Sequence, residues 1–360
     1  MHIAIDITPL ESGHKDRGTG SYTGLLIDAL QKYESKHSYS FFTRKQKVPK
    51  NVDLVHYPYF DPFFLTLSLL KPKPVVVTVH DLIPLVYPSH FPRGIRGDLK
   101  WRVQKFSLKN ARRLITDSIA SKRDIQAITG FSESLVDVIH LAPAETFYPI
   151  KDRNVLLSVQ KKYSLPDSFI LYVGDVNWNK NVQGAVKAFD ILTKTVFVKR
   201  LSLKATLVLV GKAFLDSNLC ETQEINYLIR SLHLEEQVLR LGFVPEKDLV
   251  AFYNLATVYV QPSFAEGFGL PILEAMACGC PVVCARGSSL DEIAGPSIRV
   301  NASDISSIMD GILHAEKLST SERTERIQKG YAWVKRFSWK KVASETVEVY
   351  EKALAGDRVY

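Results

Sequence analysis

A strand, a glycine-rich turn and a helix follow one another within residues 258–283, and this stretch constrains the fold more than any other. Residues 258–261 have the composition of a buried strand, and residues 270–278 have that of a helix. Gly267 and Gly269 make the turn between them flexible. Such a turn directs backbone N–H groups toward the start of the helix, where they bind anions. The stretch therefore predicts an α/β fold with an anion site at a strand end.

The same turn carries two carboxylates, Glu266 before the helix and Glu274 within it. Phosphate groups could meet the helix amides there, while sugar hydroxyls meet the carboxylates. A capped turn with a glutamate at either end is the purely structural alternative. The length and density of the pattern favour a binding site.

Residues 261–283 resemble the segment with two glutamates eight positions apart in retaining GT-B glycosyltransferases, specifically glycosyltransferase family 4. The match keeps the glycines, the prolines and both glutamates in place. In that family the second glutamate holds the ribose of the nucleotide sugar, and the first lies against the transferred sugar. The resemblance therefore implies these roles for Glu274 and Glu266. It spans nearly the whole chain and is strongest from about residue 238 to 300.

Two segments in the first half of the chain extend the resemblance. Gly18, Thr19 and Gly20 end a polar loop after the first predicted strand, and in the family this loop faces the donor phosphates and the acceptor. The loop also weakly resembles a dinucleotide fingerprint, but basic residues follow the second strand where that motif needs an acid, so no nicotinamide cofactor is expected. His80 closes a predicted strand. A lone histidine there is more often structural, but the resemblance implies contact with the donor sugar.

One basic residue of the expected diphosphate grip is present and one is missing. Lys180 fills the lysine position of a segment in which family members hold the diphosphate with an arginine and a lysine. Asp175 and Asn179 occupy the positions where that arginine usually stands. Lys212 or Arg17 could supply the charge, since a point charge reaches a phosphate without a bidentate fork.

Predicted strands and helices alternate along the whole chain, which implies two Rossmann-like, doubly wound α/β domains facing a cleft, the GT-B architecture of the resemblance. We place the first, acceptor-side domain at 1–148 and the nucleotide-sugar donor domain at 149–337. A final helix at 338–358 is expected to cross back to the first domain. Ligands are expected in the cleft.

The composition narrows the partners and the location. The 360 residues carry a net charge of +8, which suits a partner that bears phosphate. No apolar run approaches the roughly 20 residues of a membrane span. The chain enters a strand at once, without the features of a signal peptide, so a cytoplasmic location is expected. The resemblance favours a nucleotide sugar as partner, and no nucleic acid is expected.

The sequence gives no indication of a metal. The four cysteines lack the spacing of common zinc sites, and no Asp-x-Asp pair occurs that could carry a divalent ion. We therefore expect no cofactor beyond the nucleoside diphosphate sugar. The charge of the leaving group would be met by the ammonium of Lys180 and by the helix N-terminus, whose donor-binding residues are Gly267, Phe268, Gly269 and Leu270.

A basic amphipathic segment lies at residues 93–113. Eight basic residues stand there against the single acid Asp98, and they alternate with apolar residues such as Trp101 and Phe106. Such a helix can lie on an anionic membrane. It can equally be a solvated helix whose apolar side packs on the sheet, in which case Trp101 is buried and only isolated charges are exposed.

These observations predict a retaining, metal-independent glycosyltransferase that moves a hexosyl unit, such as mannosyl or glucosyl, from a nucleoside diphosphate sugar. A glycan or lipid-linked acceptor in the synthesis of cell-surface polysaccharide, such as lipopolysaccharide, is expected, with the protein peripheral at the inner membrane face. His80, Glu266 and Lys180 are the candidate catalytic residues. A glycoside hydrolase is disfavoured, because a glutamate more than one turn into the helix would not flank the same bond as Glu266. The missing arginine leaves a non-catalytic, nucleotide-sugar-binding accessory subunit as the alternative.

Overall fold

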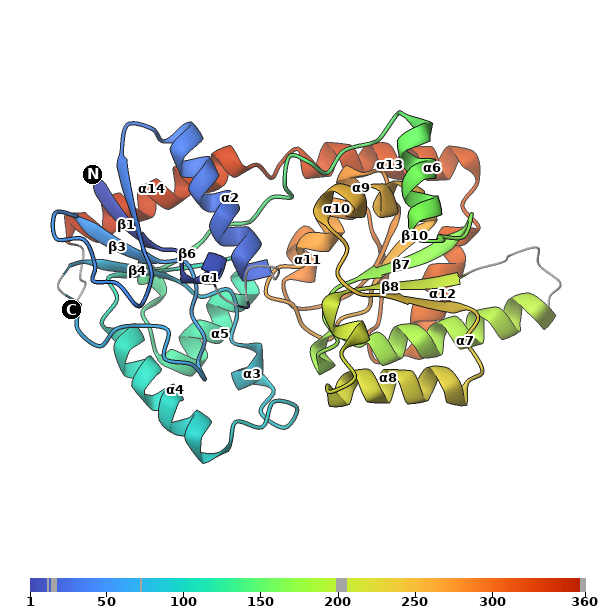
Figure 1. Ribbon diagram of the computed structural model, residues 1–360, viewed down its shortest axis with the longest axis horizontal. Coiled ribbons are helices and arrows are strands. Elements are labelled where there is room, and N and C mark those ends of the chain that lie inside the picture. The colour runs from blue at the N-terminus through green and yellow to red at the C-terminus, as the bar shows by residue number, and fades with distance from the viewer. Residues whose placement is uncertain (12, 14–17, 72, 199–205, 357–360) are drawn as a thin grey trace. The chain divides into compact units, whose positions relative to one another are not determined.

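The computed structural model divides the chain into two compact units. The first comprises Met1–Ala142 and Phe337–Tyr360, and the second comprises Pro143–Arg336. The structure describes residues 1–11, 13, 18–71, 73–198 and 206–356 (Figure 1).

The first unit contains a six-stranded parallel sheet in the order β2-β1-β3-β4-β5-β6. Most of these short apolar strands are buried, as expected for a parallel sheet covered by helices on both faces. The strands are β1 His2–Asp6, β2 Ser38–Phe42, β3 Leu54–Tyr57, β4 Val75–Thr78, β5 Arg113–Thr116 and β6 Val136–Val138. The helices are α1 Thr8–Glu11, α2 Gly18–Tyr33, α3 Ile83–Val86, α4 Gly94–Lys109, α5 Ile119–Thr129, the 3₁₀ helix η1 Glu133–Leu135 and α14 Trp339–Ala355.

The second unit repeats the arrangement with the order β12-β11-β10-β7-β8-β9, again parallel throughout. The strands are β7 Phe169–Val173, β8 Thr206–Val210, β9 Val238–Leu241, β10 Val258–Gln261, β11 Val282–Ala285 and β12 Ile298–Val300. The helices are α6 Arg153–Lys162, η2 Trp178–Lys180, α7 Val182–Val198, η3 Lys212–Leu215, α8 Cys220–Ser231, α9 Glu246–Leu255, α10 Leu270–Ala277, α11 Leu290–Ile293, α12 Ile305–Glu316 and α13 Thr320–Val334.

In each sheet the strand order reverses beside the strand that comes first in the sequence of that unit, β1 or β7. In the second unit, β8 lies on one side of β7 and β10 lies on the other. Loops from the two neighbouring strands diverge there, and ligands of doubly wound sheets bind at this switch point, outside the carboxyl ends of the strands. The switch point of the second unit is therefore bounded by the ends of β7, at Val173, and β10, at Gln261.

The last helix, α14, packs on the first unit, against α2, β4 and β5 (Figure 1). Tyr350 of this helix is fully buried, and its hydroxyl hydrogen-bonds His56 Nδ1 in β3 at 2.8 Å. Trp339 at its start lies near Tyr22 of α2, with ring centroids 6.2 Å apart. Two Rossmann-like units with a C-terminal helix on the first confirm the predicted fold class.

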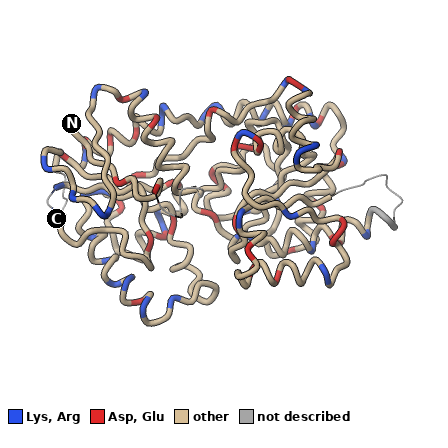
Figure 2. Tube along the Cα trace, viewed as in Figure 1, with Lys and Arg blue, Asp and Glu red and all other residues tan. Residues whose placement is uncertain are grey.

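Most of the basic segment forms α4, and of the two interpretations left open for it, the burial of Trp101 favours the helix whose apolar side packs on the sheet. Trp101 is only 8% exposed and belongs to the core of the first unit, so it is not available to a membrane. The exposed side of the helix is not purely charged, however. Ile95, Leu99 and Phe106 are also exposed. Figure 2 shows the lysines and arginines that lie along the same helix. Within the described residues, no helix has both the length and the apolar character needed to cross a bilayer.

Candidate active site

Lys180 and Glu266 meet at the switch point of the second unit. Lys180 ends η2, in the loop after β7, and Glu266 lies in the loop between β10 and α10. The lysine ammonium donates to Glu266 Oε2 at 2.6 Å. The lysine side chain is 26% exposed and the glutamate side chain 6%. A ligand can therefore reach the ammonium, while the carboxylate is sheltered from solvent.

Three side-chain donors hold the Glu266 carboxylate. Gln261 Nε2 and Ser263 Oγ donate to its Oε1 at 2.9 and 2.7 Å, and the ammonium of Lys180 donates to Oε2. A buried carboxylate requires such partners, because desolvation disfavours its charge. This network suits Glu266 to orienting a ligand and the ammonium. It does not resemble the environment of an unpaired nucleophile.

Two serines fix the backbone of the same loop. Ser288 Oγ donates to the carbonyl of Glu266 at 2.7 Å and accepts from its N–H at 3.0 Å, and Ser289 Oγ lies 2.8 Å from that carbonyl. Gly269 precedes α10 with a φ of +99°, and a Cβ there would lie 2.8 Å from Leu290 Cδ2. The turn therefore requires glycine at this position.

Two asparagines join the loop after β7 to the loop after β10. Asn179 is buried, its Nδ2 donates to the carbonyl of Ala265 at 2.9 Å, and its own carbonyl accepts from the N–H of Phe264 at 2.8 Å. Asn181 has a φ of 52° and donates from Nδ2 to the carbonyl of Pro262 at 3.0 Å. These bonds keep the lysine between them beside the glutamate loop.

Lys212 begins η3, directly after β8, and its side chain is exposed. A Cβ on the preceding Gly211 would lie 2.0 Å from the carbonyl oxygen of Gly174, so the loops after β7 and β8 pack backbone to backbone. Lys212 thus lies at the same edge of the sheet as Lys180. Arg17, the other predicted substitute for the missing arginine, falls outside the described residues.

Glu274 lies in α10 and has a separate partner. The hydroxyl of Tyr253, in α9, donates to Glu274 Oε2 at 2.9 Å. Burial of the carboxyl group raises its pKa to about 7, against the lowering effect of the Tyr253 hydrogen bond and with a further increase from Glu246. The residue as a whole is still partly exposed. Glu274 therefore changes charge near neutral pH and can be reached by a ligand.

His80 follows β4 in the first unit, and Asp117 follows the neighbouring strand β5. His80 Nδ1 donates to Asp117 Oδ2 at 2.7 Å. Burial lowers the pKa of His80, but Asp117 and, to a lesser extent, Asp81 and the Pro58 carbonyl outweigh it, so the pKa is raised overall. Nε2 of His80 makes no ordinary hydrogen bond within the described residues. The pair thus holds the imidazole in a fixed orientation, with its second nitrogen buried on the side of the Pro58 carbonyl.

The predicted loop residues of the first unit open α2. Gly18 begins the helix, Gly20 is buried, and Thr19 Oγ1 is a buried hydroxyl without a hydrogen-bond partner among the described residues. The helix also reaches the histidine, because the Tyr22 ring packs edge-on against His80 with centroids 4.6 Å apart. This part of the predicted site is therefore one local cluster of the first unit.

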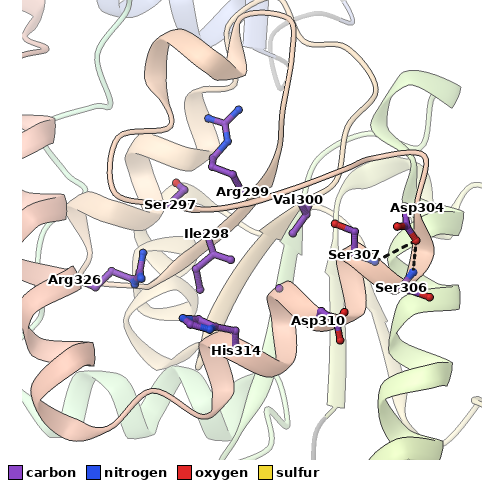
Figure 3. A pocket seen from close by; sticks show the side chains of 11 residues that line it. Ser297, Ile298, Arg299, Val300, Asp304, Ser306, Ser307, Asp310, His314 and Arg326 are labelled. Carbon is purple, nitrogen blue, oxygen red and sulfur yellow. Dashed lines mark hydrogen bonds between the residues drawn. The ribbon is translucent and has the colours of Figure 1, made fainter.

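A cavity of about 560 Å³ lies elsewhere in the second unit. It is lined by β12, α12 and α13, and Figure 3 shows Arg299 pointing away from His314. Asp304 caps α12 there by accepting from the N–H groups of Ser306 and Ser307 at 2.9 and 3.2 Å. No predicted site residue lines this cavity, which lies along an edge strand, so topology favours the switch point. Across the described residues, no three His, Cys, Asp or Glu side chains form a group that could hold a metal.

The sequence analysis missed the residues that hold the site together. Asp117 directly follows a predicted strand, and a polar residue at the carboxyl end of a parallel strand was an available signal. Gln261 and Ser263 flank the strand end beside the glutamate loop and could have been found in the same way. Tyr253 and Ser289 act through contacts between distant segments, and no local sequence signal marks them.

Models of two protein families match the chain. The model described as "Glycosyl transferases group 1" matches residues 158–333, and "Glycosyltransferase Family 4" matches residues 21–142. O-antigen chain mannosyltransferase B of Escherichia coli is 29% identical over 302 residues, which cover 83% of this chain and 75% of that protein. D-inositol 3-phosphate glycosyltransferase of Paenarthrobacter aurescens is 30% identical over 331 residues, 87% of this chain and 76% of that protein. The serotype-specific mannosyltransferase WbdA of Escherichia coli is 30% identical over 294 residues, 79% of this chain but only 34% of WbdA.

Solved structures share the fold. Sucrose-phosphate synthase from Thermosynechococcus elongatus superposes with a TM-score of 0.74 and 20% identity, over 99% of this chain and 100% of that one. HepE from Anabaena, solved in complex with UDP and glucose, superposes with a TM-score of 0.73 and 17% identity, over 97% and 99% of the two chains.

Proposed function

The chain belongs to glycosyltransferase family 4, the retaining glycosyltransferases of GT-B fold, and we propose that it transfers a mannosyl group from a nucleoside diphosphate sugar to a growing surface polysaccharide. Membership of this family means that the chain is a hexosyltransferase. The choice of mannose is supported by the names of the relatives, among them the O-antigen chain mannosyltransferase and the serotype-specific mannosyltransferases.

The ion pair of Lys180 and Glu266 at the switch point carries the proposal. The ammonium of Lys180 can reach a diphosphate, and the carboxylate of Glu266 can accept hydrogen bonds from sugar hydroxyls. The two groups lie 2.6 Å apart. Both lie beside the N-terminus of α10, where the helix dipole favours negative charge. A donor bound here would place its diphosphate against the ammonium and the helix, and its sugar against Glu266.

The transfer step follows from this placement. The bond between the anomeric carbon and the β-phosphate oxygen breaks, and charge accumulates on the departing diphosphate, where Lys180 and the α10 amides stabilise it. The anomeric carbon gains oxocarbenium character, and the acceptor oxygen bonds to it on the same face. The proton of the acceptor hydroxyl passes to the departing phosphate, the nearest base on that face. No residue needs to form a covalent sugar intermediate.

The remaining predicted residues receive supporting roles in the proposal. Glu274 accepts from the ribose hydroxyls, and Tyr253 orients it. His80, held by Asp117, contacts the transferred sugar. Gly18, Thr19 and Gly20 face the donor phosphates and the acceptor, and Lys212 adds charge near the diphosphate.

We propose a glycan or lipid-linked acceptor and a location in the cytoplasm, peripheral to the inner face of the membrane. The O-antigen relative supports the choice of acceptor, and the basic segment 93–113 supports the location. No metal ion takes part in the proposed step, because Lys180 and the helix amides supply the positive charge that a metal would otherwise bring.

A second candidate function rests on the missing arginine. Asp175 and Asn179 stand at the arginine positions, so a chain with half of the phosphate grip could bind a nucleotide sugar without turning it over. Such an accessory subunit would retain donor binding and yield no glycosylated product with any acceptor.

One experiment tests both candidates. Wild type and Lys180→Ala are assayed for transfer from radiolabelled GDP-mannose and UDP-glucose to a lipid-linked oligosaccharide, with donor binding measured by calorimetry. Loss of one preorganised charge at the leaving group should lower kcat about 100- to 1000-fold. Lys162→Ala is the matched control, because it removes an ammonium from an ion pair of the same 2.6 Å length, with Asp248, outside the loop.

The outcomes separate the candidates. Product with retained anomeric configuration, undiminished in EDTA, supports the proposed transfer. Donor binding without product from any acceptor supports the accessory subunit. Equal rates for Lys180→Ala and Lys162→Ala would remove Lys180 from the mechanism, and a strict requirement for added Mg²⁺ or Mn²⁺ would refute the metal-independent step.

A further inference from the structure

The outward side of α4 carries apolar residues in a regular stripe. Ile95, Leu99 and Phe106 recur at intervals of four and seven residues, which places them on one face of the helix. They are between 64% and 91% exposed. The inward side carries Trp101 and Leu108, which are buried in the core of the first unit. The helix thus has two apolar sides, and among the described residues of the unit only the inward side is covered.

A second exposed apolar segment lies beside this stripe. Phe64, Leu65, Leu69 and Leu70, in the loop between β3 and β4, are between 53% and 84% exposed. Together with Ile95, Leu99 and Phe106 they are called the apolar face below. Exposed apolar residues scattered singly are ordinary, but seven on two adjoining segments mark an interaction site.

Hydrogen bonds fix the loop against the helix. Gln104 of α4 is fully buried, and its side-chain carbonyl accepts from the N–H groups of Thr66 and Leu67 at 2.9 and 3.0 Å. Ser107 Oγ donates to the carbonyl of Ser68 at 2.7 Å. The loop is therefore anchored by its middle, and the apolar residues on either side of that anchor project outward.

Cations surround the apolar face. Lys100 places its ammonium 5.1 Å from the centroid of the Phe64 ring, between the helix and the loop. Asp98 is the only acid of α4, and it is already paired with Arg93 and Arg102. Of the other basic residues of the two segments, Arg96 and Lys109 are exposed and Lys73 is half-buried. The ammonium groups of Lys71 and Lys105 donate to the carbonyls of Ser107 and Ile128.

We propose that the apolar face is a docking site for an anionic phospholipid bilayer. The seven apolar side chains would enter the interface of the headgroups and acyl chains, and the surrounding lysines and arginines would lie among the lipid phosphates. Charge complementarity selects this occupant over a second copy of the chain. A symmetric dimer would bring the same surface onto itself, so the cations of one copy would face the cations of the other.

This inference deepens the proposed function, since a docked enzyme would meet a lipid-linked acceptor in the plane of the membrane. It also changes which residues of the first unit are expected to contact a membrane. The exposed cations of α4 remain, but Trp101 and Arg113, which is buried in β5 and paired with Asp137, are absent from the contact. The loop around Leu70 is added to it. Apolar insertion and charge should therefore both be required.

The test is co-sedimentation of the full chain with vesicles of phosphatidylcholine alone or with phosphatidylglycerol added, at low and high salt. The apolar variant is Leu70→Ser with Ile95→Ser, and the charge variant is Arg96→Gln with Lys100→Gln and Lys109→Gln. Each cation near an anionic surface contributes about fivefold to partitioning, so the charge variant should bind about 100-fold more weakly. The apolar variant should bind at least about tenfold more weakly.

Matched controls remove the same numbers of exposed large side chains and of cations outside the face. Leu215→Ser with Tyr227→Ser removes two apolar side chains that are 64% and 69% exposed. Lys151→Gln with Lys247→Gln and Lys340→Gln removes three exposed lysines. Both controls should sediment like wild type, and circular dichroism should show that all four variants keep the fold.

Binding by wild type only to anionic vesicles, weakened by salt and by both test variants, supports the docking site. Equal sedimentation of wild type and either test variant would overturn it, as would absence of wild-type binding. If wild type dimerises in solution and the apolar variant does not, the apolar face binds a second copy of the chain instead. Sedimentation needs no catalysis, so failure of the proposed transfer would leave this result intact, and the reverse also holds.

Discussion

Removal of the Tyr253 hydroxyl should change the pH dependence of donor binding without disturbing the fold. Tyr253 is fully buried, and its ring packs against Tyr259 and Phe147 with centroids 5.6 and 5.8 Å away. Phenylalanine would keep these contacts. The single interaction lost would be the 2.9 Å hydrogen bond to Glu274, the proposed ribose ligand.

The magnitude follows from the pKa of Glu274. Burial raises that pKa to about 7, so roughly half of the carboxyl groups are ionised at neutral pH. A hydrogen bond to a charged group is worth about 1.5–3 kcal/mol, so its loss should raise the pKa by about 1–2 more. The ionised fraction at pH 7 would then fall to about 1–10%, and donor affinity would fall about 5- to 50-fold if the carboxylate is the form that accepts from the ribose.

The assay is calorimetric titration with GDP-mannose at several values between pH 6 and pH 9, because the diphosphate of a nucleotide sugar is fully ionised across this range. Wild type should bind more tightly as the pH rises through about 7, and Tyr253→Phe should need a higher pH to reach the same affinity. Glu274→Gln should bind weakly at every pH. Tyr163→Phe is the matched control, because it removes a hydroxyl that donates to Asp248 at 2.7 Å in the same unit.

A weakened affinity of Tyr253→Phe that does not recover at pH 9 would refute the reasoning, since the loss would then be structural. An unchanged affinity at pH 7 would remove Tyr253 from the donor site. If Tyr163→Phe shifts the pH profile equally, the effect does not arise at Glu274.

Two other predictions concern titration. Asp117→Asn should lower the pKa of His80, because the carboxylate that raises it is lost, and the pH profile of kcat/KM should move to lower pH; an unchanged profile would show that His80 does not titrate in the reaction. Glu274 has a pKa raised from 4.5 to about 7 by folding, so its contribution to stability is complete below pH 4.5 and is lost as the pH rises through 7. Relative to Glu274→Gln, the free energy of unfolding of wild type should therefore fall by about 3 kcal/mol between pH 4.5 and pH 8, which urea titration would measure, and parallel curves would contradict it.

The fold was predictable because its signals are local. Short apolar strands such as Val75–Thr78 and Val258–Gln261, separated by helical segments, read directly as parallel α/β structure. The turn before α10 was predictable from its glycines, because Gly269 adopts a positive φ that other residues avoid. These features depend on neighbours in the sequence.

The pairing of Lys180 with Glu266 could not be derived in this way. It depends on β7 and β10 lying side by side, and 86 residues separate the two partners. A sequence pattern also could not decide which side of α4 faces the sheet, because apolar residues occur on both sides of it. The side on which Trp101 lies was therefore left open, and the structure shows that Trp101 is buried whereas Ile95 and Leu99 are exposed.

The missing arginine has different meanings at its two possible positions. Asn179 is buried, and its side chain and backbone carbonyl hold the loop that carries Glu266. An arginine there would lose the side-chain bond to Ala265 and would place a larger, charged side chain at a buried position. Asp175 is partly exposed, and its side chain accepts only from the N–H of Val176, at 2.9 Å, in the described contacts. The substitution at 179 therefore serves the geometry of the site, whereas the one at 175 removes a charge that the fold could accommodate. In the proposed site the diphosphate grip then depends more heavily on Lys180 and on the start of α10, so the variant at Lys180 is the decisive test of the proposed function.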